Sequence, residues 1–219
     1  MVQLEFMEEN KDYYKARFVF DKGRTVVWRA INEYFAKFVN QSDTVLDIGC
    51  GYGDFTNGIK AKKKFAIDLN EDMHSYLNSE VEFMAQSVLE PYSHIPTNSV
   101  DVVFASNLLE HFNDTELSQL LSQVKAVLKD GGKLILMQPN IYYAYREYWD
   151  DYTHKKAFSH ISLTDFLVAN GFTLEHIEKR FIPFSLKSRL PKSYWITKLY
   201  LMLPFRMFAK QMLVVVKLK

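Results

Sequence analysis

Cysteine is nearly absent from this chain of 219 residues, and the one thiol belongs to Cys50. A single cysteine excludes an internal disulfide and also a zinc site built from several thiolates. Long apolar runs are missing too. The most apolar stretch, residues 194–208, is interrupted by Lys198, Pro204 and Arg206. A membrane-spanning helix needs about 20 consecutive apolar residues. That stretch cannot cross a bilayer on its own.

Acidic residues are scarce in the C-terminal part of the chain. Residues 176–219 contain ten Lys or Arg residues and one acid, Glu178, although the formal net charge of the whole chain is only +1. Such an asymmetry predicts either an anionic partner for the C-terminal segment or a helical insert solvated by its cations. The N-terminal residues are acidic and do not resemble a secretory signal, so we expect a cytoplasmic protein.

Apolar runs and helical patterns alternate along the chain. We expect strands at 44–48, 65–68, 81–84, 100–105 and 133–138, with helices at 54–60, 71–79 and 114–128 between them. Residues 8–40 have a helical apolar spacing, and the C-terminal part predicts a helix at 162–171 and strands within 172–183 and 210–217. Alternation of this kind is typical of an α/β fold, in which a doubly wound parallel sheet carries helices on both faces.

The most informative segment is a strand that runs directly into three alternating glycines. Residues 45–48 are followed by Gly49, Gly51 and Gly53, whose bare backbone lets a ligand come close. A dinucleotide-binding loop has a third glycine where this chain has Asp54. Because a carboxylate is a poor neighbour for a pyrophosphate, a nicotinamide cofactor is disfavoured. S-adenosylmethionine, which carries positive charge and no phosphate, suits the loop better.

Four segments resemble, in order, the motifs of the class I S-adenosylmethionine-dependent methyltransferases. They are 45–55 (VLDIGCGYGDF), 66–70 (AIDLN), 99–112 with its Leu-Glu-His turn, and 128–136. The resemblance implies a Rossmann-like sheet of seven strands, mostly parallel, with an antiparallel last strand. It also implies a single domain over 1–219, made of a helical cap (1–42), a cofactor-binding core (43–140) and an acceptor-side half (141–219).

The same resemblance assigns roles in cofactor binding. Asp47 would face the ammonium group, Asp68 would accept the ribose hydroxyls, and Asn107 would line the sulfonium side. Ser87 stands where the family usually has an Asp for the adenine amino group, so a hydroxyl would accept that hydrogen bond instead. The expected set is Asp47, Gly49, Cys50, Gly51, Gly53, Asp68, Leu69, Ser87, Val88 and Asn107.

Candidate catalytic residues lie in two segments. His111 follows the fourth expected strand, and His154 ends the segment YWDDYTH, which resembles part of a methyltransferase subgroup found with bacterial surface-glycan biosynthesis. The resemblance implies O-methylation of a small-molecule or glycan-linked acceptor, with His154 or His111 as general base and Asp151 as an orienting partner. Each of these side chains could instead be structural.

A metal site and several other functions remain open at this point. Asp150, Asp151, His154 and His160 match no standard spacing of metal ligands, so we expect no metal. An apolar natural product or a quinone-like acceptor is an alternative, and so is a regulatory protein that binds S-adenosylmethionine without turnover. Nucleic acid is not expected as a partner, because the basic segment is also apolar.

The basic aromatic insert, residues 187–209, has three possible roles. It could be a lid over the acceptor, the interface of a homodimer, or a segment that lies on an anionic membrane surface through residues 187–210. The last role would bring this cytoplasmic protein to the inner surface of the membrane.

Overall fold

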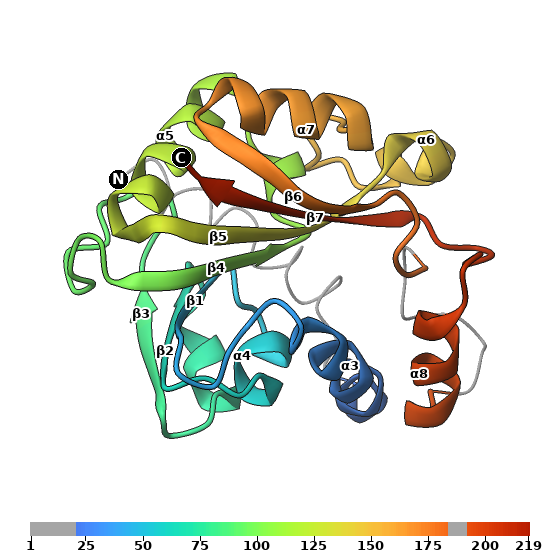
Figure 1. The fold of residues 1–219 in the computed structure, drawn as a ribbon, viewed down its shortest axis with the longest axis horizontal. Helices are drawn as coiled ribbons and strands as arrows, with labels where there is room; N and C mark the ends of the chain where they lie inside the picture. The colour runs from blue at the N-terminus through green and yellow to red at the C-terminus, as the bar shows by residue number, and fades with distance from the viewer. Residues whose placement is uncertain (1–20, 184–191) are drawn as a thin grey trace.

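The structure is a computed structural model that describes residues 21–183 and 192–219. Its strands are β1 Thr44–Ile48, β2 Lys63–Asp68, β3 Val81–Ala85, β4 Val100–Ser106, β5 Leu128–Pro139, β6 Phe172–Glu178 and β7 Gln211–Leu218. They form a seven-stranded sheet in the order β3-β2-β1-β4-β5-β7-β6 (Figure 1). Among these described strands, β7 runs antiparallel to both of its neighbours, β5 and β6, whereas the other neighbouring pairs are parallel. The expected mostly parallel sheet with an antiparallel last strand is confirmed.

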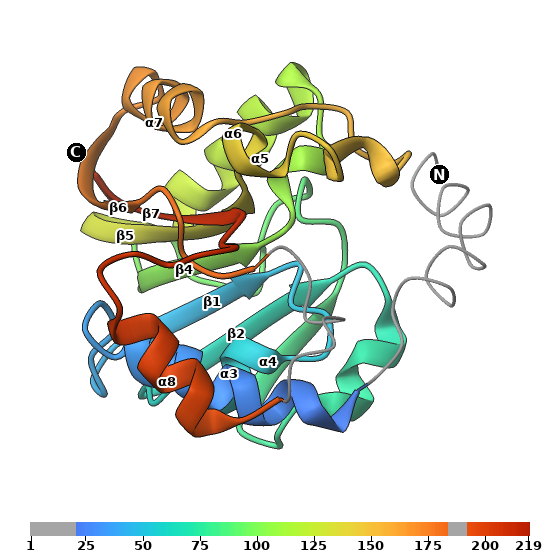
Figure 2. The same ribbon diagram turned by 90° about the vertical axis from the view of Figure 1, so that its right-hand side faces the viewer.

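Helices cover both faces of this sheet. They are α3 Lys22–Phe35, α4 Asp54–Gly58, α5 Asp114–Val127, α6 Ile141–Ala144, α7 His160–Ala169 and α8 Tyr194–Met202, with 3₁₀ turns η1 Glu71–Tyr76, η2 Leu109–His111 and η3 Tyr148–Asp150. The helices α5, α6 and α7 lie on one face, and α3, α4 and α8 lie on the other (Figures 1 and 2). Each face has its own apolar core, which explains why most side chains of the central strands β1 and β4 are buried.

Several boundaries differ from those that the sequence predicts. The helix expected at 71–79 is the shorter 3₁₀ turn η1, because the backbone is extended again at Leu77. The strand expected at 133–138 begins at Leu128, which pairs with Val100 ahead of an irregularity in the register. The helix expected at 162–171 begins at His160, where Ser159 caps it through the amide of Ser162.

The helix expected over residues 8–40 is confirmed for Lys22–Phe35, and residues 8–20 lie outside the described part of the chain. Trp28, Ile31 and Phe35 point from this helix into the core beneath the sheet. Asp21 caps its N-terminus by accepting a hydrogen bond from the amide of Gly23 at 2.8 Å.

The basic C-terminal segment finds many of its acidic partners within the chain. Lys192 pairs with Asp21, Lys198 with Glu33, Arg206 with Glu178, and Lys210 with Glu147. The charge asymmetry therefore reflects, in part, contacts between the C-terminal residues and more acidic segments. Among the helices of residues 21–183 and 192–219, none is long and apolar enough to cross a membrane.

Candidate active site

The glycine loop joins β1 to α4 at the carboxyl edge of the sheet. Gly49, Gly51 and Gly53 have φ angles of 68°, 51° and 68°, which lie in the left-handed region that glycine enters without steric cost. The amides of Gly49 and Cys50 donate to the carbonyl of Ile67 at 2.8 and 3.1 Å. The loop is thereby fastened to the end of β2.

The three glycines meet different surroundings. A Cβ at Gly53 would overlap Leu77 Cδ2, and a Cβ at Gly49 would lie 2.9 Å from Leu108 Cδ1. A Cβ at Gly51 would meet no atom within 4 Å. A Cβ at either outer position would therefore have to displace a leucine side chain, whereas Gly51 borders open space that a ligand can approach.

Asp68 lies at the end of β2 and faces this loop. Its Oδ2 accepts a hydrogen bond from the amide of Gly51 at 2.8 Å, and its Oδ1 accepts one from the amide of Asn70 at 2.9 Å. Two backbone donors fix the carboxylate, and each oxygen keeps a lone pair for a further donor. This geometry fits a ribose diol, although the contact itself stays a prediction.

Asn107 stands at the neighbouring edge, where β4 ends. Its φ of 49° is unusual for a residue other than glycine. Its side-chain oxygen accepts a hydrogen bond from Gln211 Nε2 at 2.7 Å. The sequence did not indicate this partner, since Gln211 is 104 residues away and belongs to β7. The predicted position of Asn107 on the sulfonium side remains untested.

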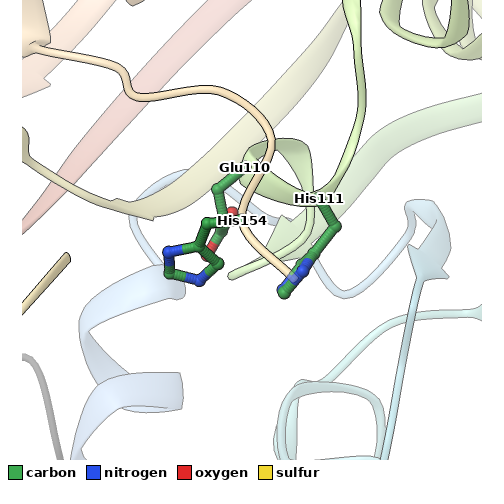
Figure 3. A group of neighbouring side chains, drawn as sticks. All are labelled: Glu110, His111 and His154. Carbon is green, nitrogen blue, oxygen red and sulfur yellow. The ribbon is translucent and has the colours of Figure 1, made fainter. Parts of the chain in front are cut away.

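A cluster of polar side chains forms beyond Asn107. Ligand-type atoms of Glu110, His111 and His154 all lie within 4.8 Å of one another (Figure 3). Glu110 and His111 belong to η2, whereas His154 comes from the segment after η3. Backbone hydrogen bonds from Lys155 and Lys156 to the carbonyl of Glu110, at 2.8 and 3.1 Å, hold the two segments together.

Both imidazoles of this cluster are oriented through Nδ1. His154 Nδ1 lies 2.6 Å from the carbonyl oxygen of Tyr148. His111 Nδ1 lies 3.0 Å from Thr153 Oγ1, and that hydroxyl donates to Asp151 Oδ1 at 2.7 Å. The structure thus brings together His154, His111 and Asp151, the three catalytic candidates from the sequence.

Comparisons with known proteins decide the family. Residues 20–177 match a family described as a methyltransferase domain, which is more than half of the chain. The chain belongs to this methyltransferase family. Over 104 residues, or 43% of the chain, it is 33% identical to phosphoethanolamine N-methyltransferase 1 of Triticum aestivum. Over 138 residues, or 61% of the chain, it is 30% identical to norreticuline-7-O-methyltransferase of Papaver somniferum.

The alignments cover only 21% of the wheat methyltransferase and 38% of the poppy methyltransferase. A solved S-adenosylmethionine-dependent methyltransferase of Archaeoglobus fulgidus has the same fold, with a TM-score of 0.64 and 22% identity over 89% of this chain and 94% of that one. Family and fold together identify an S-adenosylmethionine-dependent methyltransferase domain. The relatives include both an N- and an O-methyltransferase.

The edge that carries the glycine loop, which we call the candidate cofactor edge, has carboxylates beneath the loop. Asp47 is only 2% exposed and accepts a hydrogen bond from Thr56 Oγ1 at 2.5 Å. Burial, together with the nearby charges of Asp68 and Asp54, raises the pKa of Asp47 to about 7, although the hydrogen bond from Thr56 acts in the opposite direction. In residues 21–183 and 192–219 no cation forms an ion pair with Asp47. A ligand with a sulfonium and an ammonium would relieve this repulsion.

Two side chains of the loop have partners within the chain. Arg24 donates to Asp54 Oδ2 from Nε and Nη2 at 3.0 and 2.6 Å, so Asp54 repels a pyrophosphate less than its place in the sequence suggests. The Cys50 side chain packs with Ala66 and Val81, and burial raises the pKa of its thiol. Cys50 can therefore contact a cofactor only through its backbone.

The expected adenine contacts lie in the loop after β3. Ser87 is buried, and its Oγ already accepts a hydrogen bond from the amide of Leu89 at 3.1 Å. The carbonyl of Val88 accepts one from the Tyr92 hydroxyl at 2.8 Å. An adenine amino group would need the second lone pair of one of these oxygens. Leu69, which is half-buried, stays a predicted packing partner for the ring.

The edge that carries Glu110, His111 and His154, which we call the candidate acceptor edge, has strongly perturbed ionisable groups. Burial raises the pKa of Glu110 to about 8 and lowers the pKa of His111 to about 4. The nearby His154 also contributes to the lowered pKa of His111, whereas the charge of Asp151 opposes that shift and contributes to the raised pKa of Glu110. His160, which the sequence placed in a possible metal site, instead lies with its Nδ1 3.2 Å from Asn140 Nδ2.

Proposed function

We propose that this methyltransferase transfers a methyl group to a hydroxyl of a small-molecule or glycan-linked acceptor. The observation that carries the proposal is the Glu110–His111–His154 cluster at the acceptor edge. When bound, S-adenosylmethionine supplies a methyl group that its sulfonium already activates, so the chain has mainly to align the acceptor. A hydroxyl must also lose its proton, and a cluster of this kind can take it.

His154 is the preferred general base. A carbonyl oxygen can only accept, so Nδ1 of His154 donates to Tyr148, and the neutral ring carries its lone pair on Nε2. Asp151 acts on the other ring, because its hydrogen bond to Thr153 makes the Thr hydroxyl an acceptor for His111 Nδ1. Asp151 is therefore a positioning residue for His111.

Exposed aromatic side chains support a carbohydrate-like acceptor. Tyr142, Tyr145, Trp149 and Tyr152 are 60%, 60%, 56% and 75% exposed, and they all belong to the segment that leads to His154. Aromatic faces of this kind can cover the apolar side of a sugar ring, while the neighbouring acids and His154 bind its hydroxyls. This supports the likeness to the glycan-biosynthesis subgroup.

The helix α8 does not favour an apolar acceptor such as a quinone. Trp195, Leu199 and Met202 are 73%, 63% and 74% exposed, whereas an apolar acceptor would need such side chains to line its pocket. We propose that a second copy of this chain covers them. An anionic membrane is the weaker alternative, because Lys192, Lys198 and the neighbouring Arg206 are already paired with acids.

Light scattering on the wild type and on Trp195→Ala/Leu199→Ala tests this contact. We expect a dimer that the double substitution turns into a monomer. A wild-type monomer that sediments with anionic vesicles would overturn the dimer and support membrane contact through residues 187–210.

The acceptor is tested by supplying labelled S-adenosylmethionine to the full chain with a matched panel. One arm contains hydroxyl acceptors, namely sugar nucleotides, lipid-linked glycans and phenols, and the other contains amines, including phosphoethanolamine. We expect transfer to a hydroxyl and its loss in His154→Ala. Transfer to an amine alone would overturn O-methylation. Tight cofactor binding without any transfer would support the alternative of a regulatory protein.

A further inference from the structure

Glu110, His111 and His154 form a group of ligands typical of a metal site. Atoms that share a metal at about 2.0–2.2 Å lie at most roughly 4.4 Å apart. The ligand atoms of these three residues lie within 4.8 Å of one another (Figure 3), so small side-chain rotations suffice. No other group of this kind occurs in residues 21–183 and 192–219.

The orientation of both imidazoles suits ligation. His154 Nδ1 donates to the Tyr148 carbonyl, and His111 Nδ1 donates to the Thr153 hydroxyl, which is itself held by Asp151. Each neutral ring therefore carries its lone pair on Nε2. In metal sites, a ligating His almost always donates its second ring N–H to a carbonyl, a carboxylate or a similar acceptor, and this fixes the ring.

Glu110 gives an independent indication. Its side chain is 1% exposed, and its Oε2 has no hydrogen-bond partner among the described residues. A buried oxygen without a partner is costly, because it has lost water and gained nothing in return. A cation bound between Glu110 and the two imidazoles would satisfy it.

Backbone contacts already hold the segments of Glu110 and His154 together without a metal. Residues 109–111 form η2 at the end of β4, and the amides of Lys155 and Lys156 fasten the His154 segment to the Glu110 carbonyl. Ligands held by backbone contacts of this kind lose little freedom when a metal binds.

We propose that Glu110, His111 and His154 bind one divalent transition metal, of the class of Zn²⁺, Fe²⁺ or Mn²⁺. Two imidazoles and one carboxylate are a ligand set for such ions and leave coordination positions open. From the sequence we expected no metal, because the possible ligands Asp150, Asp151, His154 and His160 match no standard spacing. The proposed site shares only His154 with that group. With a metal bound, Nε2 of His154 would be a ligand and could no longer act as the general base, and the metal would instead lower the pKa of an acceptor hydroxyl at an open position. That last role rests on the proposed function, but metal binding itself does not.

Calorimetric titration of the chelator-treated full chain with Zn²⁺ and with Mn²⁺ tests the site. We expect one equivalent to bind to the wild type, and we expect Glu110→Gln and His154→Gln to weaken binding at least tenfold. His94→Gln is the matched control, because this exposed histidine lies outside the cluster and should leave binding unchanged. Absence of binding in the wild type, or binding that survives both substitutions, would overturn the site.

Two further measurements separate this proposal from misfolding and from a wrong acceptor. Thermal unfolding and S-adenosylmethionine affinity report whether each variant is folded. If a variant is not, the absorption spectrum of the wild type with Co²⁺ decides, since nitrogen ligation of low coordination number gives intense visible bands and an unspecific surface ion gives weak ones. None of these titrations contains an acceptor, so failure of the hydroxyl proposal leaves their result unaffected.

Discussion

The two edges of this active site are built in different ways. At the cofactor edge, one continuous stretch from Asp47 to Asn70 supplies the loop, and its backbone makes most of the contacts. At the acceptor edge, side chains from η2 meet a segment about 40 residues further on, as the pair His111 and Thr153 shows. A site built from one stretch of backbone can be recognised in the sequence by the spacing of its residues. A site built from side chains that are distant in the sequence has no such pattern.

The largest expected effect separates the two edges by their function. His154→Ala should lower kcat for a hydroxyl acceptor by about 10²–10⁴-fold, the usual contribution of a general base. The affinity for S-adenosylmethionine should change less than twofold, because His154 belongs to the acceptor edge. Steady-state kinetics and calorimetry measure the two quantities. An equal loss of kcat and of affinity for S-adenosylmethionine would show that His154 does not act at the acceptor edge alone.

The reciprocal substitution is Asp68→Ala. It removes the carboxylate that the amides of Gly51 and Asn70 hold in place. Two charge-assisted hydrogen bonds to ribose contribute about 1.5–3 kcal/mol each, so the affinity for S-adenosylmethionine should fall at least 100-fold. Asp72→Ala, an exposed acid four residues away, is the control that should bind normally. Unchanged affinity in Asp68→Ala would remove the ribose assignment.

Substitutions of Gly53 and Gly51 should affect stability and cofactor binding differently. Gly53→Ala should destabilise the fold by about 2–4 kcal/mol, because its φ is positive and a Cβ would overlap Leu77. Gly51→Ala should cost only about 1–2 kcal/mol of backbone strain while it weakens cofactor binding, since its Cβ would enter the open space. Denaturant unfolding and calorimetry on both variants test this. Equal effects on stability would contradict the distinction.

A smaller effect concerns the pH dependence of stability without cofactor. Because burial raises the pKa of Asp47 from 3.8 to about 7, the folded protein binds more protons than the unfolded chain between these values, and stability falls as pH rises through this window. Asp47→Asn removes the charge and should increase the free energy of unfolding at pH 8 by about 1–3 kcal/mol. Near pH 4 the difference should vanish. Wild type and variant with parallel pH profiles would show that Asp47 is not buried as a charge.

Much of the fold could be predicted because its signals are local. The strands β1, β2, β3 and β4 are short apolar runs, and the helix α5 has a regular apolar face at Leu117, Leu120, Leu121 and Val124. The errors fall where local signals are weak. No periodicity distinguishes the 3₁₀ turn η1 from a helix, and the early start of β5 depends on Val100, a partner across the sheet.

The residues of the candidate site were likewise predictable only where their signals are local. The glycine loop and Asp68 were predicted because strand, turn and carboxylate follow one another at short range. Glu110 was missed as a member of the cluster, since only its burial next to His154 gives it a role. The ion pairs of Arg24 and Arg206 also depend on distant partners, so the net charge of a segment could not show which cations remain for a ligand.

We propose that the loop from Asp47 to Asn70 holds the cofactor with its sulfur directed to the cluster of Glu110, His111 and His154. A crystal structure of the full chain with S-adenosylhomocysteine tests it most directly. We expect ribose hydroxyls about 2.7–3.2 Å from the carboxylate of Asp68 and the sulfur on the side of Asn107 that faces the cluster. A ribose bound away from Asp68, or a sulfur directed away from the cluster, would contradict it.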